Sequence, residues 1–337
     1  GRKYSVLFNS GSSANLALLQ ALLNLEIIKK GENIGFSSLT WATNVMPIIE
    51  LGFNPIPIDI NIENLNIMLE NLKNTKQKIK ALFITNLLGF CGDLDKIKEY
   101  CEKEKIILLE DNCESLGSKL NKTLLGNFGL ASTFSFYVGH HLSTIEGGMV
   151  CTDNKELYEM LVMVRAHGWS RNLSQESKDE LKKKFKISSF YDDYSFYVLG
   201  YNFRATEITG FLGCEQLNYM NEICKKRNNN FIQYEKAAEK NNDFVKLNLK
   251  HMDFVCNFAY PIICKDKQTF EKYIKKFNNN DIEIRPIVGG NMAQQPFFSK
   301  VYECENSKKV HELGFYVPNN PDLTDNEIKK ICDTMKK

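Results

Sequence analysis

Two adjacent histidines, His140 and His141, precede Glu146-Gly147-Gly148 in a stretch with the character of a loop. An imidazole with an unperturbed pKa of about 6.5 can take up a proton at neutral pH, so a histidine here could act as a general base. A metal site made of both histidines and Glu146 is an alternative, but no aspartate or cysteine lies within the loop to complete its ligands. We therefore expect no metal, and for His141 a structural role in packing or hydrogen bonding.

A carboxylate in a second stretch could hold the ring nitrogen of a pyridine. Asp111 follows Leu108 and Leu109 at the end of an apolar run that predicts a buried strand. Ligands collect at the carboxyl ends of strands in open α/β sheets. A carboxylate placed there can keep a pyridine nitrogen protonated, which makes the ring an acceptor of electrons. A structural aspartate at a strand end is the alternative that this feature alone leaves open.

Two further stretches could hold a flat ligand that carries a phosphate. Trp41 could stack on an aromatic ring, although a tryptophan of the core would fit the same pattern. Gly11 and Ser12 belong to a small-residue turn that leads into a helix. Backbone N–H groups, hydroxyls and the positive end of the helix dipole favour a phosphate at such a turn. A capped helix start without a ligand explains the turn as well.

The elements that must position these residues alternate between strands and helices in the first half of the chain. Helical spacing of leucines predicts a helix over Ala14–Ile28, and a second helix is expected at Asp93–Glu104. The alternation predicts a mainly parallel sheet covered by helices. The predicted strands are Tyr4–Phe8, Asn33–Phe36, Pro55–Asp59, Ile79–Ile84, Lys105–Leu109, Ala131–Phe136 and Met149–Thr152.

The second half predicts a connecting helix and a smaller α/β unit. A polar helix is expected over Met220–Asn242, followed by a strand at Phe258–Ile263, a helix at Gln268–Asn278 and a final amphipathic helix at Asp322–Lys337. We divide the chain into a large domain at 1–217 and a connecting helix with a small C-terminal domain at 218–337. The basic run Leu181–Lys186 is expected to be a solvated helix face or a mobile loop, with phosphate binding as the alternative.

Composition narrows the function classes. A chain of 337 residues is long enough for two cores. A net charge of +2 gives no indication of a nucleic-acid or membrane-surface protein, and no apolar run approaches the roughly 20 residues of a membrane span. The ten cysteines are scattered and form no CxxC pair, which predicts reduced thiols in a cytoplasmic enzyme.

Several motifs together carry a resemblance to a known family. Their order and spacing are similar to those of the DegT/StrS family of sugar aminotransferases, which are fold-type I pyridoxal phosphate enzymes. The resemblance implies an aspartate-aminotransferase-like α/β fold: a large domain with a mainly parallel mixed sheet, plus a small C-terminal α/β domain. The segment that usually precedes the first phosphate turn is absent or shortened, which suggests a trimmed chain. The matching stretches are Asn9–Asn15, Thr40–Asn44, Glu110–Gly117, Ser135–Gly148, Gly200–Glu207 and Arg285–Pro296.

The departure from the family pattern is a histidine in the place of its lysine. The pattern places lysine five residues after the serine of Ser-Phe and six before Glu-Gly-Gly, and counting from Ser135 and from Glu146 both give position 140. No lysine lies between Lys122 and Lys155. This substitution resembles that of the 3-dehydratases that make 3,6-dideoxysugars. The stretch His-His-x-Ser-Thr-x-Glu-Gly-Gly-Met is more similar to the branch that acts on GDP-linked sugars. The CDP-linked branch also needs clustered cysteines, including a C-x-C, for an iron–sulfur cluster, and this sequence has none.

The resemblance also assigns roles around a cofactor that is not covalently attached, pyridoxal 5′-phosphate or its amine form, pyridoxamine 5′-phosphate. Asp111 would pair with the pyridinium nitrogen and Trp41 would stack on the ring. Glu114 would brace the region of the ring oxygen. The remaining contacts would hold the cofactor phosphate, with the last of them reaching in from the partner subunit of a homodimer with shared active sites: Gly11, Ser12, Ser135 and Asn202.

Three further residues are candidates for the nucleotide-sugar substrate. Arg285 and Asn291 could grip its pyrophosphate, since a fixed guanidinium suits phosphate oxygens. His167 could line the sugar pocket. A surface ion pair for Arg285 and a structural turn for His167 remain as alternatives.

The reaction implied by the resemblance removes an oxygen from a sugar. The cofactor amine would condense with the C4 ketone of a nucleotide-linked 4-keto-6-deoxysugar, His140 would remove a proton from the cofactor, and the C3 hydroxyl would leave as water. Hydrolysis would release a 3,6-dideoxy-4-keto sugar and ammonia. An amino donor, expected to be glutamate, would restore the amine. Such sugars serve surface polysaccharides, an expectation that rests on family analogy alone.

Two rival functions remain open at this point. One is an ordinary nucleotide-sugar aminotransferase that leaves nitrogen on the sugar. The other is a catalytically silent homologue that binds the cofactor or the nucleotide sugar. Retention of Asp111, Trp41, Ser135 and Asn202 argues against a silent protein, which has no need of an electron acceptor.

Overall fold

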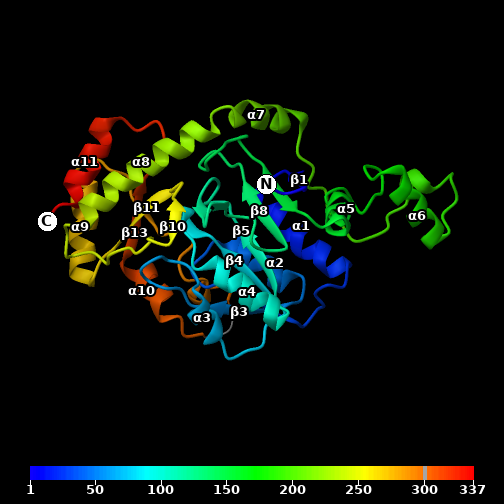
Figure 1. Cartoon of the computed structure of the whole chain (residues 1–337), viewed down its shortest axis with the longest axis horizontal. Helices are drawn as coiled ribbons and strands as arrows, with labels where there is room; N and C mark the ends of the chain where they lie inside the picture. The colour runs from blue at the N-terminus through cyan, green and yellow to red at the C-terminus, as the bar shows by residue number, and fades with distance from the viewer. Residues whose placement is uncertain (299–301) are drawn as a thin grey trace.

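A seven-stranded sheet forms the centre of the computed structural model, which describes residues 1–298 and 302–337 (Figure 1). The strand order is β1-β9-β8-β5-β4-β2-β3. The pairs from β3 to β8 are parallel, whereas β9 pairs antiparallel with both β8 and β1. The predicted mainly parallel mixed sheet is thereby confirmed. Its strands are β1 (Tyr4–Phe8), β2 (Asn33–Ser37), β3 (Asn54–Ile58), β4 (Ala81–Thr85), β5 (Ile107–Asp111), β8 (Ala131–Ser135) and β9 (Gly148–Thr152).

Helices and the C-terminal part of the chain cover both faces of this sheet. In β4, Ala81 and Phe83 point into one apolar cluster while Leu82 and Ile84 point into the other, as the two-residue period of a strand requires. The first cluster is covered by α1 (Gly11–Asn24), α2 (Met46–Glu50) and α5 (Lys155–Val164). The second is covered by α3 (Leu69–Lys73), α4 (Leu94–Glu104) and the C-terminal part. Coverage on both sides explains why the strands read as continuous apolar runs.

The C-terminal part is a smaller α/β unit packed on the second face. Its antiparallel sheet has the order β11-β13-β12, built from β11 (Ala259–Ile263), β12 (Arg285–Pro286) and β13 (Gly314–Pro318). A small sheet of β10 (Met252–Phe254), β6 (Lys119–Leu120) and β7 (Thr123–Leu124) links it to the first half. The helices are α8 (Met220–Ala238), α9 (Lys267–Asn278), α10 (Glu305–Leu313) and α11 (Asp325–Met335). One apolar cluster runs from the large sheet into this unit, so the division at residue 217 stays a prediction.

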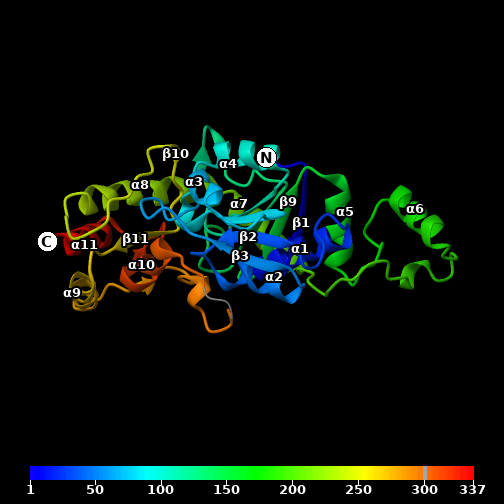
Figure 2. The same ribbon diagram turned by 90° about the horizontal axis from the view of Figure 1, so that it is seen from below.

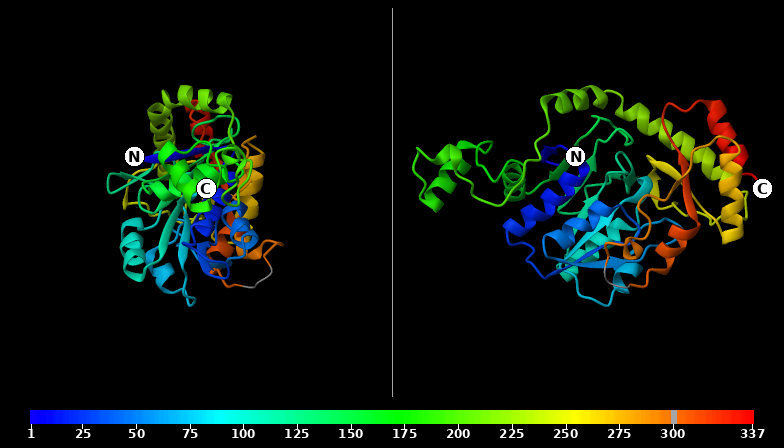
Figure 3. Two further views of the ribbon diagram at one scale, coloured as in Figure 1. Left: turned by 90° about the vertical axis from the view of Figure 1, so that its right-hand side faces the viewer. Right: turned by 180° about the vertical axis from the view of Figure 1, so that it is seen from behind.

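An arm of the chain extends away from the main body. Helix α6 (Gln175–Phe185) stands apart in Figure 1, Figure 2 and Figure 3, and α7 (Glu207–Leu217) continues into α8 along one side of the molecule. The basic run Leu181–Lys186 lies at the end of α6 and is largely exposed, as expected of a solvated helix face. Exposed apolar side chains gather on the arm and α7, among them Phe190, Tyr194 and Phe211.

The elements differ from the predictions mainly at their ends. The first helix begins at Gly11 because Ser10 caps it, three residues before the predicted start, and the last helix begins at Asp325 because Thr324 caps it. The sequence reasoning placed no element at α5, α7, α10 or β13, and at α6 it expected only a helix face or a loop over Leu181–Lys186. None of the helices in the described ranges is long and apolar enough to cross a membrane.

Candidate active site

Asp111 lies on the floor of a cavity of about 1160 Å³ at the carboxyl ends of β4, β5 and β8. Its Oδ2 accepts hydrogen bonds from the side-chain amides of Asn15 (2.9 Å) and Asn44 (2.8 Å), and its Oδ1 accepts the N–H of Cys113 (2.9 Å). No basic side chain among the described residues forms an ion pair with it. The carboxylate is thus held rigidly and lacks a cation, which suits a protonated ring nitrogen.

The first turn of α1 and the end of β8 form a cradle beside Asp111. A Cβ on Gly11 would lie 2.6 Å from the Cβ of Ser135, so the helix approaches the strand this closely because residue 11 is glycine. Gly148, the partner of Ser135 in the β8–β9 pair, allows a similar approach, because a Cβ there would lie 2.1 Å from the carbonyl oxygen of Ser10. The first N–H groups of a helix have no partner within it. With the hydroxyls of Ser12 and Ser135 they provide donors for an anion.

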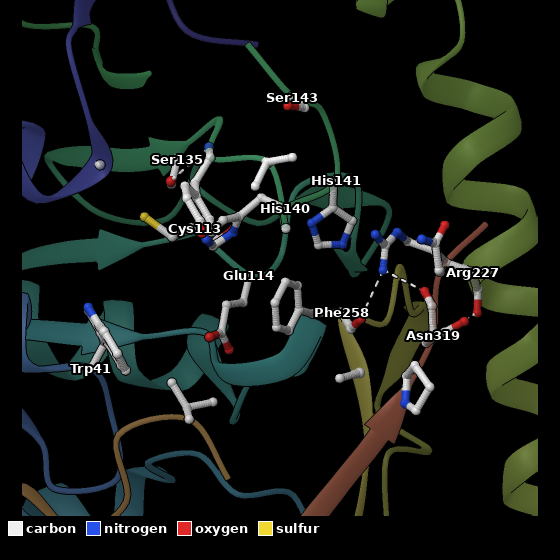
Figure 4. Close-up of a pocket in the computed structure, with 18 of the residues that line it drawn as sticks. Trp41, Cys113, Glu114, Ser135, His140, His141, Ser143, Arg227, Phe258 and Asn319 are labelled. Carbon is white, nitrogen blue, oxygen red and sulfur yellow. Dashed lines mark hydrogen bonds between the residues drawn. The ribbon is translucent and has the colours of Figure 1, made fainter. Parts of the chain in front are cut away.

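Trp41 forms another wall of the same cavity. It follows β2, and its side chain is 54% exposed, so one ring face is open towards the cavity. Figure 4 shows it opposite the histidine loop. A flat aromatic ligand could stack here with one edge towards Asp111 and its anionic group towards Gly11.

His140 sits at the tip of the loop that joins β8 to β9. The loop is closed by hydrogen bonds from Phe136 N to Gly147 O (2.9 Å) and from Val138 N to Ile145 O (3.1 Å). It folds back over the end of β5, where His140 Nδ1 lies 2.5 Å from the carbonyl oxygen of Cys113. A carbonyl can only accept, so Nδ1 carries the proton, and in the neutral ring Nε2 is left with its lone pair.

Burial lowers the pKa of His140, and the nearby Arg227 guanidinium acts in the same direction against the Cys113 carbonyl and Asp111. The ring also lies 5.2 Å from that of Phe258, centroid to centroid. At neutral pH His140 is therefore an uncharged base. Its neighbour His141 is buried and donates from Nε2 to the Cys256 carbonyl (2.9 Å), so it has the structural role expected of it.

Glu114 enters the cavity between Trp41 and Phe258 (Figure 4). Its Oε2 accepts the N–H of Leu88 at 2.9 Å. Burial raises its pKa to about 8, with a further contribution from the negative charge of Asp111. The cavity therefore favours the neutral form of Glu114 more than water does.

The outer end of the cavity is lined by charged and polar groups of α8 and the small unit. Arg285 lines it and also forms an ion pair with Glu283 (Nη2 to Oε1, 2.6 Å). Arg227 donates from Nη1 to the carbonyls of Phe258 (2.9 Å) and Asn319 (2.6 Å). Among the described residues, Lys226 is the lysine of the lining; it is paired with a glutamate on α8.

Three predicted residues lie outside this cavity. Asn291 is buried, and its side-chain oxygen accepts the N–H of Ala293 (3.1 Å). His167 occupies a left-handed turn (φ 61°) and packs against Trp169. Asn202 is exposed and forms a bridge with Ala166. The substrate and partner-subunit roles of these residues stay predictions.

The sequence analysis did not identify the residues that hold Asp111 and His140 in position. Asn15 and Asn44 are both buried and lie within the stretches that match the family. The asparagine in each stretch was the feature of the sequence that could have suggested a partner for Asp111. The contacts of His140 with the Cys113 carbonyl and the Phe258 ring, and the buried Arg227, had no comparable signal. They come from distant parts of the chain and, in one case, from the backbone.

Comparison with known proteins places the chain in a family. The sequence profile of the DegT/DnrJ/EryC1/StrS aminotransferase family matches residues 1–336. The chain belongs to this family. Members of the DegT/DnrJ/EryC1/StrS family that it resembles include GDP-4-keto-6-deoxy-D-mannose 3-dehydratase of Yersinia pseudotuberculosis, 34% identical over 100% of this chain and 88% of the relative.

Solved structures of the family agree. The GDP-4-keto-6-deoxy-D-mannose-3-dehydratase of Escherichia coli with bound hydrated PLP superposes with a TM-score of 0.88 and 32% identity, covering 100% of this chain and 88% of that one. A structure described as GDP-4-keto-6-deoxymannose-3-dehydratase with a trapped PLP-glutamate geminal diamine gives a TM-score of 0.90 and 31% identity, covering 100% and 89%. The aspartate-aminotransferase-like fold expected from the motifs is confirmed.

Proposed function

We propose that this protein is a 3-dehydratase that removes the C3 hydroxyl from a nucleotide-linked 4-keto-6-deoxysugar, with pyridoxal or pyridoxamine 5′-phosphate bound non-covalently. The observation that carries the proposal is His140. It stands where the family has its lysine, its Nδ1 is committed to the Cys113 carbonyl, and its Nε2 is free to act as a base.

The cavity fits the cofactor by the chemistry of its donors. An uncompensated carboxylate (Asp111), an open aromatic face (Trp41) and a helix start beside Ser135 match a pyridinium nitrogen, a flat ring and a phosphate. When bound, the cofactor supplies the amine that joins the sugar at C4 and the ring that accepts electrons as the C3 hydroxyl leaves. Glu114 would lie near the ring oxygen.

The side chains of this protein bind, orient and move protons. Nε2 of His140 takes the proton whose removal allows the C3 hydroxyl to depart. Phe258 covers one side of the imidazole and limits access of water to it. A lysine at 140 would instead bond to the cofactor covalently and return nitrogen to the sugar. Lys226 does not take this place, because its Nζ is paired with Glu222 at 3.1 Å and its side chain is 49% exposed.

The outer end of the cavity supports a nucleotide-sugar substrate. Arg227, Arg285 and Lys226 supply positive charge there, and the volume of about 1160 Å³ is large enough for a cofactor together with a nucleotide sugar. Glutamate is the proposed amino donor, in keeping with the glutamate adduct of the related structure. We place the reaction in the cytoplasm, in the synthesis of dideoxysugars for lipopolysaccharide or a similar surface polysaccharide.

A homodimer with shared active sites is part of the proposal. The exposed apolar side chains of the arm and α7 form a surface of the kind that marks a protein interface, and their sequence neighbours include Asn202. A second copy of the chain covering this surface would bring Asn202 to the partner's cofactor phosphate.

The deciding experiment incubates the purified protein with a 4-keto-6-deoxy nucleotide sugar, pyridoxal phosphate and glutamate, and identifies the sugar by mass spectrometry. A sugar without its C3 oxygen supports the dehydratase. An amino sugar supports the rival aminotransferase, and no turnover of GDP- or CDP-linked substrates supports the silent homologue.

A further inference from the structure

One positive charge in the cavity wall is buried without a counterion. Arg227 of α8 is 5% exposed and lines the cavity, yet no carboxylate among the described residues forms an ion pair with it. Asp322 is the carboxylate whose charge reaches it, from an exposed position. Arg285 is the contrast, because it is exposed and paired with Glu283. A buried cation that lacks an anion is costly, so Arg227 favours an anionic ligand in the cavity.

The hydrogen bonds of Arg227 occupy one of its two terminal nitrogens. Nη1 donates to the carbonyl oxygens of Asn257 (3.4 Å), Phe258 (2.9 Å) and Asn319 (2.6 Å). Nε is buried and has no partner among the described residues, and Nη2 makes no hydrogen bond to any of them. Figure 4 shows the guanidinium directed from α8 towards His141, with two of the Nη1 bonds dashed. The side chain is thus anchored through Nη1 and keeps Nη2 for a ligand.

This guanidinium lies one residue beyond the base. Its Nη1 holds the carbonyl of Phe258, and the ring of Phe258 packs 5.2 Å from that of His140 and 6.2 Å from that of His141, centroid to centroid. The charge of Arg227 accordingly lowers the pKa of both histidines. An anion bound to Arg227 would therefore be separated from His140 by the width of Phe258.

The amino donor has an anionic group at that reach. His140 must contact the carbon that bears the donor's amine, because this carbon loses its proton as the amine passes to the cofactor and the donor leaves as a 2-oxo acid. The α-carboxylate is attached to that carbon and stays beside His140. The side-chain carboxylate of glutamate is two methylenes farther away, which matches the place of Arg227 beyond Phe258.

We propose that Arg227 binds the side-chain carboxylate of the amino donor and thereby selects an acidic amino acid such as glutamate. The inference rests on the proposed cofactor and donor, and it applies whether the nitrogen later leaves as ammonia or stays on the sugar. The nucleotide sugar and the donor use the cavity in turn, and the sugar has Arg285 and Lys226 for its own anionic groups.

The first readout is binding without turnover. Glutarate carries two carboxylates as glutamate does but has no amine, and butyrate carries one carboxylate. In calorimetric titrations of the protein loaded with pyridoxal phosphate, glutarate should bind more tightly than butyrate. Arg227→Gln should weaken glutarate about ten- to hundredfold and leave butyrate nearly unchanged.

Arg165→Gln is the matched control. Arg165 also donates from Nη1 to a backbone carbonyl, that of Leu7 (3.1 Å), and its Nε is likewise buried without a partner among the described residues. It does not line the cavity. Loss of this arginine should leave glutarate binding at the wild-type value.

The second readout is the choice of donor in the half of the reaction that needs no sugar. Conversion of the cofactor to its amine form is followed by absorbance, with glutamate or with glutamine, whose side chain is neutral. In wild type, kcat/KM for glutamate should exceed that for glutamine about ten- to hundredfold. Arg227→Gln should lower the value for glutamate only, and Arg227→Lys should restore part of the preference because it keeps the charge.

Two results overturn the proposal. A wild-type protein that uses glutamate and glutamine equally well does so without any variant. Equal losses for both donors in Arg227→Gln do so as well, because they assign the arginine to the α-carboxylate or to the fold. Formation of an amino sugar by the wild type overturns the dehydratase function, whereas the binding and donor measurements, made without sugar, still test Arg227.

Discussion

At the scale of single residues, the account depends on how one imidazole is oriented. The hydrogen bond from His140 Nδ1 to the Cys113 carbonyl selects the tautomer, and burial beside Phe258 keeps the ring uncharged. Nε2 can act as a base because the Cys113 carbonyl oxygen holds the ring proton on Nδ1. A residue that cannot hold a proton at that atom should lose the reaction.

Substitution of His140 tests this directly. His140→Asn keeps a polar side chain of similar reach but no base, and we expect dehydration to fall by about 10² to 10⁴-fold while nucleotide-sugar binding is retained. His140→Lys should bond to the cofactor and shift the product towards an amino sugar. Product analysis by mass spectrometry checks both variants. Dehydration by either variant at the wild-type rate would rule out His140 as the base.

Glu114 gives a prediction about stability and pH. Its pKa is about 8 in the folded protein against 4.5 for a free glutamate, so between these values the folded state binds more protons than the unfolded state. Stability must then fall as pH rises through that window. Glu114→Gln removes this loss, and its melting temperature relative to wild type should rise from pH 5 to pH 8. If the difference in melting temperature between wild type and Glu114→Gln does not change with pH, Glu114 is ionised in the folded protein.

At the scale of elements, the site exists because three chain segments meet closely. The start of α1 packs against the paired residues Ser135, at the end of β8, and Gly148, at the start of β9, and glycines at 11 and 148 make that approach possible. The Glu-Gly-Gly motif thus serves the phosphate cradle by leaving space for the Ser10 carbonyl.

Gly148→Ala should disturb the cradle. The added Cβ would lie 2.1 Å from the Ser10 carbonyl oxygen, so we expect a loss of about 1 to 3 kcal/mol in stability together with weaker pyridoxal phosphate binding. Glu99→Ala on the exposed side of α4 is the control, because it lies away from the cradle and from the apolar surface of the arm and α7, and it should be close to neutral. Thermal unfolding and cofactor titration measure the two effects. Equal behaviour of both variants would contradict the proposed cradle.

The strands of the large sheet were predicted from the sequence, whereas some helices were not. All seven strands of the large sheet were predicted, because strands buried on both faces leave uninterrupted apolar runs such as β4. Helix α7 was missed for the opposite reason. Its apolar residues Ile208 and Phe211 are exposed in the single chain, so no single buried face sets a helical pattern. Among the site residues, those within motifs were found, whereas Phe258 and the Cys113 carbonyl depend on the tertiary fold.

At the scale of the whole molecule, the proposed dimer would cover the exposed apolar side chains of the arm and α7. We expect a dimer in sedimentation experiments, and Phe211→Asp should weaken it by placing a charge in the apolar surface.

Shared sites can be tested by mixing two inactive variants. In a hybrid dimer of His140→Asn and Asn202→Ala, one of the two sites would combine an intact His140 with an intact Asn202 from the other chain. Refolding an equal mixture should then recover about a quarter of the wild-type rate, as expected for a two-fold interface. If the mixture recovers no activity, His140 and Asn202 of one chain act in the same site.

The central claim is that nitrogen does not stay on the sugar because His140 cannot anchor the cofactor. The ratio of ammonia released to nucleotide sugar consumed by the wild-type protein measures this most directly. The account predicts one ammonia for each sugar that loses its C3 oxygen. Consumption of the sugar without release of ammonia, with the nitrogen recovered on the product, would contradict it.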